Sequence, residues 1–150
     1  MIFEEYYEKY LNYKDIKDKL NRLENKKVSL MSMVDVQGSS AETDKTSSNI
    51  KEDKMLRYLE ELEEIEEKII LRKKALEEAK KQLEQKEKEL RESKEDLDKV
   101  YAFKYLEHLK YYQIATKINF GKTKTYDLIN EIDSRINLIK IAFAEKNGKK

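Results

Sequence analysis

Seven apolar residues recur at seven-residue steps through the middle of the chain, and this heptad constrains the fold more than any other feature. They are Met55, Leu62, Ile69, Leu76, Leu83, Leu90 and Leu97. Such a repeat predicts a long helix that presents one apolar seam to a partner helix. The usual helix breakers are scarce, since the chain has no proline and 3 glycines. We therefore expect an all-α protein with a long coiled-coil helix over residues 51–96.

Residues 1–27 predict a second amphipathic helix. Its apolar face has helical spacing and carries Phe3, Tyr6, Tyr10, Tyr13, Ile16, Leu20 and Leu23. An aromatic stripe can stack on nucleic acid bases, but the residues between are mixed in sign and form no basic groove, which favours packing against another helix. Residues 28–50 lose the pattern and end in a Gly/Ser/Thr/Asp-rich stretch, which predicts a flexible linker.

The heptad seam needs a cover, and two are available. The N-terminal helix can fold back over Met55–Ile70, and a second copy of the chain can pair along Leu76–Leu97 in a homodimer. Polar residues at the companion seam position, such as Arg72 and Lys86, weaken such a dimer interface. The competing interpretation is a lone helix held by its Glu–Lys pairs.

Residues 97–150 predict a helix-turn-helix with a basic tail. Apolar residues at helical spacing form three groups, which lie around Val100, Ile114 and Ile132. Asn119, Phe120 and Gly121 separate the last two groups. Asparagine tolerates the left-handed backbone that a tight turn requires, and Phe120 is expected to turn inward as an apolar plug.

Charge is distributed unevenly along the chain. The formal net charge is +1, yet residues 99–150 carry 11 Lys or Arg against 5 Asp or Glu. This basic excess lies on the segment that would need it to attract phosphates. The alternative is chance plus the lysines at 146, 149 and 150.

The composition argues against catalysis. The chain has 1 histidine, no cysteine and no glycine-rich phosphate loop, so we expect no enzyme, no cofactor and no metal site. No apolar run approaches a membrane span, and the N-terminus is acidic, unlike a signal peptide. We therefore expect a cytoplasmic protein without a membrane partner.

The C-terminal segment resembles sigma-factor region 4. The match rests on Val100, Phe103, Tyr105, Leu109, Ile114, Ala115, Ile118, Phe120 and Thr125. The chain departs from that pattern at His108 and Asn119, which replace glycines, and at Gly121, which replaces the capping serine. The order of parts resembles small phage and prophage transcriptional regulators of the ArpU/RinA type. That resemblance implies control of late phage genes in a bacterial host and makes host RNA polymerase a candidate partner.

The expected function is sequence-specific binding of double-stranded DNA by a transcriptional regulator. The alternatives are a phage small terminase subunit and a coiled-coil adaptor that binds no DNA. In the recognition helix the candidate contacts are Lys122, Thr123, Lys124, Tyr126, Asp127 and Asn130. Lys110, Tyr111 and Gln113 open the supporting helix, where phosphate contacts are common. Leu128, Ile129 and Ile132 are expected to face inward.

Overall fold

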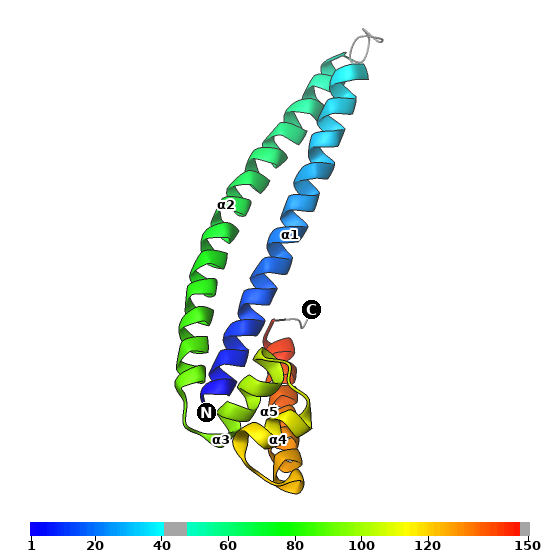
Figure 1. Ribbon diagram of the computed structural model, residues 1–150. Helices are drawn as coiled ribbons and strands as arrows, with labels where there is room; N and C mark the ends of the chain where they lie inside the picture. Colours follow the sequence, from blue (N-terminus) through cyan, green and yellow to red (C-terminus); the bar gives the residue numbers. More distant parts are fainter. Residues whose placement is uncertain (41–47, 148–150) are drawn as a thin grey trace. The chain divides into compact units, whose positions relative to one another are not determined.

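The chain is all-helical, as its sequence predicts. The computed structural model describes residues 1–40 and 48–147, and the side chains of residues 1–33 and 53–147; every element in these ranges is a helix (Figure 1). The elements are α1 (Ile2–Ser40), α2 (Ser48–Glu92), α3 (Asp96–Tyr101), the π-helical turn η1 (Ala102–Leu106), α4 (Tyr111–Ile118) and α5 (Lys122–Asn147). None of these helices is long and apolar enough to cross a lipid bilayer.

Helix α1 extends further than the sequence pattern predicts. A linker was expected from residue 28, but the helix continues to Ser40. Leu30 explains part of the difference, because its side chain is buried with Leu20, Ile65 and Ile69. This tertiary contact stabilises helix beyond the end of the regular apolar pattern. Residues 41–47, the rest of the expected linker before α2, lie outside the described residues.

The chain divides into two compact units, and α1 and α2 contribute to both. Unit 2 comprises residues 15–77 and is a helical hairpin, in which α1 and α2 run antiparallel (Figure 1). Its buried core consists of Leu20, Leu30, Ile65 and Ile69, with Leu62 and Leu76 packed against it. The expectation that α1 covers the first half of the seam is confirmed here for Ile65 and Ile69.

Unit 1 comprises residues 1–14 and 78–150 and holds the larger core. Its centre is aromatic. The Phe3 ring stacks on Tyr101 at 5.4 Å between centroids, and Tyr101 stacks on Tyr105 at 4.9 Å. Tyr7 is buried beside Tyr6, although the sequence pattern did not place it on the apolar face. The same core includes Ile114 and Ile132, so residues 97–150 do not form a separate domain.

The seam leucines are covered within one chain, which overturns the reason for expecting a dimer there. Leu90 is 1% exposed and Leu97 is 6% exposed, both in the core that contains Phe3 and Tyr6. Leu83 packs against that core, and Leu76 packs against the core of unit 2. The prediction failed because it shortened α1 and assigned its aromatic residues to the wrong half of the seam. A homodimer along Leu76–Leu97 therefore loses its physical basis.

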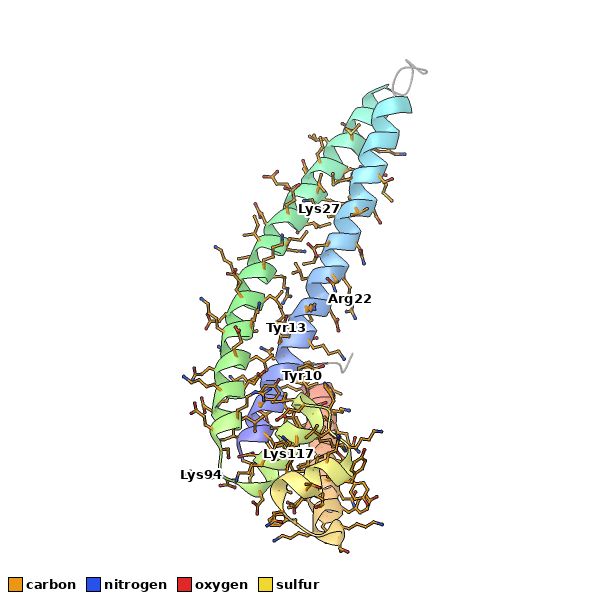
Figure 2. All side chains as sticks on the ribbon, viewed as in Figure 1. Tyr10, Tyr13, Arg22, Lys27, Lys94 and Lys117 are labelled. Atoms are coloured by element: carbon orange, nitrogen blue, oxygen red, sulfur yellow. The ribbon has the colours of Figure 1, made fainter. Side chains whose placement is uncertain are left out.

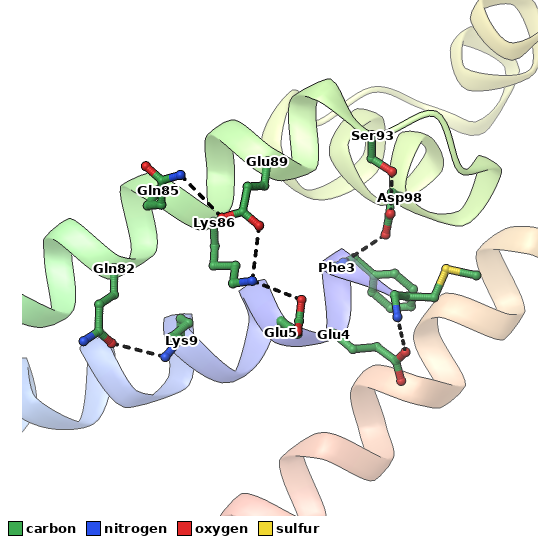
Figure 3. A network of polar contacts seen from close by, with 11 residues as sticks. Phe3, Glu4, Glu5, Lys9, Gln82, Gln85, Lys86, Glu89, Ser93 and Asp98 are labelled. Carbon is green, nitrogen blue, oxygen red and sulfur yellow. Dashed lines mark hydrogen bonds and ion pairs between the residues drawn. The ribbon is translucent and has the colours of Figure 1, made fainter.

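Helix α2 also ends earlier than expected, at Glu92 rather than Asp96. A turn follows, in which the Ser93 amide donates to the Leu90 carbonyl at 3.2 Å. The Ser93 hydroxyl donates to the carboxylate of Asp98 at 2.6 Å. The other oxygen of Asp98 accepts the Phe3 amide at 2.9 Å, so one buried carboxylate joins the start of α1 to the turn after α2 (Figure 3). Asp98 thus fixes the chain's first residues inside unit 1.

Candidate nucleic-acid interface

The candidate interface consists of α4, the turn after it and the first half of α5, all within unit 1. The π-helical turn η1 ends at Leu106, and His108 follows it with a φ of 57°. Histidine is one of the residues that adopt a positive φ more readily than most. Helix α4 then begins after Lys110, whose amide donates to the Gln113 side-chain oxygen at 2.9 Å. Gln113 therefore closes the N-terminus of α4 with its carbonyl oxygen, which leaves its amide group free to donate.

Asn119 makes the turn between α4 and α5. Its φ of 62° and ψ of 39° are left-handed, as its sequence position predicts. The amides of Asn119 and Phe120 both point to the carbonyl of Ala115, the latter at 3.2 Å, which closes the helix end in the manner of a Schellman motif. This geometry connects α4 to α5 through the three residues 119–121 and leaves the start of α5 exposed.

Phe120 does not act as the plug that its sequence position predicts. Its ring is half-buried outside the core, and the Lys124 ammonium lies 4.1 Å from the ring centroid. Thr125 fills the inner position instead: it is fully buried, and its hydroxyl donates to the Gly121 carbonyl at 2.9 Å. A left-handed residue directly before Phe120 redirects its side chain to the surface, which helical spacing cannot reveal.

Helix α5 has a buried face and an exposed polar face. Ile129 and Ile132 are buried and Leu128 is half-buried against the core, so the prediction that these three face inward is confirmed. The opposite face carries exposed polar residues at three- and four-residue steps, namely Thr123, Asp127, Asn130 and Ser134. Lys122 and Lys124 flank this row at its N-terminal end, and both are exposed. The row therefore offers donors and acceptors between two cations.

Two tyrosines join α4 to α5. The rings of Tyr111 and Tyr126 stack with centroids 4.4 Å apart and planes 19° apart. Tyr126 remains 42% exposed, but Tyr111 is half-buried and packs against the core. Tyr111 therefore mainly packs α4 against α5. Its side chain is less accessible to a phosphate than the sequence predicts. The stack fixes how far α5 projects beyond α4.

Some cations in unit 1 form ion pairs with carboxylates. Lys86 bridges Glu5 at 3.1 Å, and Arg135 bridges Glu4 at 3.2 Å. The bonds from Glu5 and Glu89 raise the pKa of Lys86. Four exposed lysines around the turn have no carboxylate partner among the described residues, namely Lys110, Lys117, Lys122 and Lys124. Unpaired ammonium groups remain available to an anionic ligand.

Lys117 belongs to this group, although it is not among the DNA contacts predicted from the sequence. It lies on α4 (Figure 2). Steps of three and four residues place Lys110, Gln113 and Lys117 on one face of that helix. That spacing was visible in the sequence and would have identified it. The nine residues selected from the sequence all lie on α4, on α5 or at the N-terminus of α4, and eight of them are exposed; Tyr111 is the exception.

Residues of η1 contact α5 through their side chains. The Tyr105 hydroxyl donates to Asp133 on α5, and Lys104 reaches the same carboxylate at 2.9 Å. Burial, followed by this hydrogen bond, raises the pKa of Tyr105. Burial likewise raises the pKa of Tyr101 and of Tyr6. These phenols stay neutral through the ordinary pH range and hold α5 against the first turns of α1.

No known family model, curated protein or solved structure matches this chain.

Proposed function

We propose that the protein binds double-stranded DNA through α5 and acts as a sequence-specific transcriptional regulator. The observation that carries the proposal is the exposed N-terminal half of α5, projected by the left-handed turn at Asn119 and flanked by unpaired lysines. A helix presented in this way fits the major groove, where base pairs show distinct donor and acceptor patterns. Phosphates on either side would neutralise the lysines.

Each exposed residue has a role that follows from its chemistry. Lys122 and Lys124 lie at the helix start and suit phosphate contacts, which orient the protein. Thr123 and Asn130 face outward with groups that bond base edges, and asparagine pairs most naturally with adenine. Asp127 lies between them and accepts hydrogen bonds only, which suits the amino group of cytosine.

Helix α4 offers a second set of phosphate contacts. Lys110 and Lys117 lie on the exposed face of α4 with Gln113 between them. In helix-turn-helix proteins the first helix crosses the DNA backbone while the second enters the groove. The similarity to sigma region 4 supports this assignment of α4 and α5. The wider likeness to phage and prophage regulators supports late phage genes as targets and host RNA polymerase as a further partner.

The test compares two double variants of equal charge change. Lys122→Ala with Lys124→Ala removes the cations at the start of α5. Lys140→Ala with Lys146→Ala removes two exposed lysines near the other end of the same helix. Affinity for duplexes selected from a random-sequence library is measured at several salt concentrations. If both residues of the first pair contact phosphates, the log-log salt slope falls by roughly 1.8, at ~0.9 per contact.

The control pair separates local contact from general attraction. We expect Lys140→Ala with Lys146→Ala to leave the slope nearly unchanged. Equal losses for the two pairs would show that DNA responds only to net charge, and α5 would no longer be the reading helix. If the wild-type protein binds no duplex, the alternative that remains is a coiled-coil adaptor that binds no DNA.

Sequence reading is tested by Asn130→Ala. The variant should relax the preference at one base pair by about 1–3 kcal/mol while the salt slope stays the same. Selected sequences that are identical for the variant and the wild type would exclude Asn130 from base recognition. Because Asn130 is exposed, the fold should not change.

A further inference from the structure

Unit 2 carries a basic groove on one side of the helical hairpin. The groove has a volume of about 540 Å³ and lies between α1 and α2. Three of its lining residues are apolar, namely Leu23, Leu71 and Ala75. The other five are cationic, and no carboxylate lines it: Lys19, Arg22, Lys26, Lys68 and Arg72. Apolar surface enclosed by cations is suited to an acidic amphipathic helix.

Two of the five cations already have partners along their own helices. Lys19 lies 3.0 Å from Asp15, and Lys68 lies 3.8 Å from Glu64. Arg22, Lys26 and Arg72 form no ion pair among the described residues, and Figure 2 shows Arg22 on α1. Leu71 in the groove is 65% exposed. The groove therefore offers both uncompensated charge and exposed apolar surface.

The same hairpin displays a ridge that is complementary to the groove. Leu56, Leu59 and Ile70 are 57%, 45% and 55% exposed. At helical spacing they share one side of α2 with Glu63 and Glu66, which are also exposed. Between residues 60 and 67 the chain has six glutamates and no lysine or arginine. The ridge is thus an acidic amphipathic helix with an apolar crest.

Helical spacing places the groove and the ridge on different sides of α2. Ile70 belongs to the ridge and Leu71 to the groove, and adjacent residues in a helix point about 100° apart. A ridge cannot fill the groove of its own hairpin from that position. It can fill the groove of another copy, and a contact between two different surfaces repeats head to tail.

We propose that the basic groove of unit 2 binds the acidic ridge of a second copy of this chain. Glu63 and Glu66 of one copy then meet Arg22, Lys26 and Arg72 of the other, while the exposed leucines and isoleucine cover Leu23 and Leu71. A symmetric pairing of two ridges is disfavoured, because it brings the glutamates of both copies together. Head-to-tail contact yields a series of oligomers, either a closed ring or an open chain.

Two variants of the full-length protein test the proposal by sedimentation velocity. Arg22→Glu with Arg72→Glu disables the groove and leaves the ridge intact. Leu59→Asn with Ile70→Asn removes two of the three apolar residues of the ridge and leaves the groove intact. We expect the wild type to form a concentration-dependent series at tens of micromolar that shrinks at high salt. Each variant alone should be monomeric, with an apparent Kd raised roughly tenfold or more.

The mixture of the two variants is decisive. One intact ridge can meet one intact groove, so an equimolar mixture should give a 1:1 dimer and nothing larger. Lys54→Glu with Arg57→Glu changes the charge by the same amount outside the groove and should assemble as the wild type does. Far-UV circular dichroism verifies that every variant keeps its helix content.

Three results would overturn the proposal. The wild type could stay monomeric at low salt, which would leave the groove to a different partner. The groove variant could assemble like the wild type, which would indicate ridge-to-ridge pairing. The mixture could remain monomeric although the wild type assembles, which would place the contact elsewhere on the chain.

Discussion

Replacing Asp98 by alanine should destabilise unit 1 more than any other single carboxylate change. Asp98 is 1% exposed, and its two oxygens accept the Phe3 amide at 2.9 Å and the Ser93 hydroxyl at 2.6 Å. Removing it leaves the Phe3 amide, an otherwise unpaired donor at the start of α1, buried without an acceptor. The Ser93 hydroxyl is only part-buried and can turn to water, so its loss costs less.

The magnitude follows from these two bonds. A hydrogen bond to a charged group contributes about 1.5–3 kcal/mol, and an orphaned buried donor costs a similar amount. With the Ser93 bond partly replaced by water, we expect Asp98→Ala to lower the free energy of unfolding by about 3 kcal/mol. Asp98→Asn keeps one acceptor oxygen and should lose roughly half of that.

Tyrosine signals make the assay specific to unit 1. Of the 10 tyrosines, only Tyr58 lies between residues 15 and 77, and the chain has no tryptophan. Urea unfolding followed by tyrosine fluorescence therefore reports on unit 1, and far-UV circular dichroism reports on both units. Asp96→Ala, an exposed carboxylate on the same helix, is the matched control and should cost under about 1 kcal/mol. Equal values for Asp98→Ala and Asp96→Ala would refute the assigned role of Asp98.

Two further predictions concern the turn and the aromatic core. Because Asn119 has a φ of 62° and an exposed side chain, Asn119→Gly should leave the thermal midpoint nearly unchanged, whereas Asn119→Val should cost about 1–2 kcal/mol; equal midpoints would contradict the left-handed turn. Burial raises the pKa of Tyr101 above its ordinary value of 10.0, so the unfolded chain loses the phenolic proton first as the pH rises. The contribution of Tyr101 to the free energy of unfolding should be fully present below about pH 10 and fall above it. Tyr101→Phe should flatten that fall in urea titrations at high pH. An unchanged slope would count against a buried phenol.

The amino-acid sequence by itself determined the helical class and the local turn chemistry. The heptad from Met55 to Leu97 predicts helix, because helix formation depends on the spacing of apolar residues and on the lack of proline among near neighbours. Asn119 was predicted to take a left-handed backbone and does so, and His108, which stands where the resembled pattern has glycine, also adopts a positive φ. Backbone preferences of this kind depend on a residue and its neighbours, so a sequence reveals them.

Only the tertiary structure decided which surfaces cover one another. The sequence pattern assigned Leu90 to a homodimer interface, because nothing local shows that Phe3, 87 positions earlier, lies in the same core. The burial of Asp98 likewise depends on tertiary contacts, because its two oxygens accept the Phe3 amide and the Ser93 hydroxyl. The continuation of α1 beyond residue 28, where Leu30 is buried against α2, has the same cause. Packing free energy between distant segments overrides local pattern, and spacing along a chain does not record which distant segments meet.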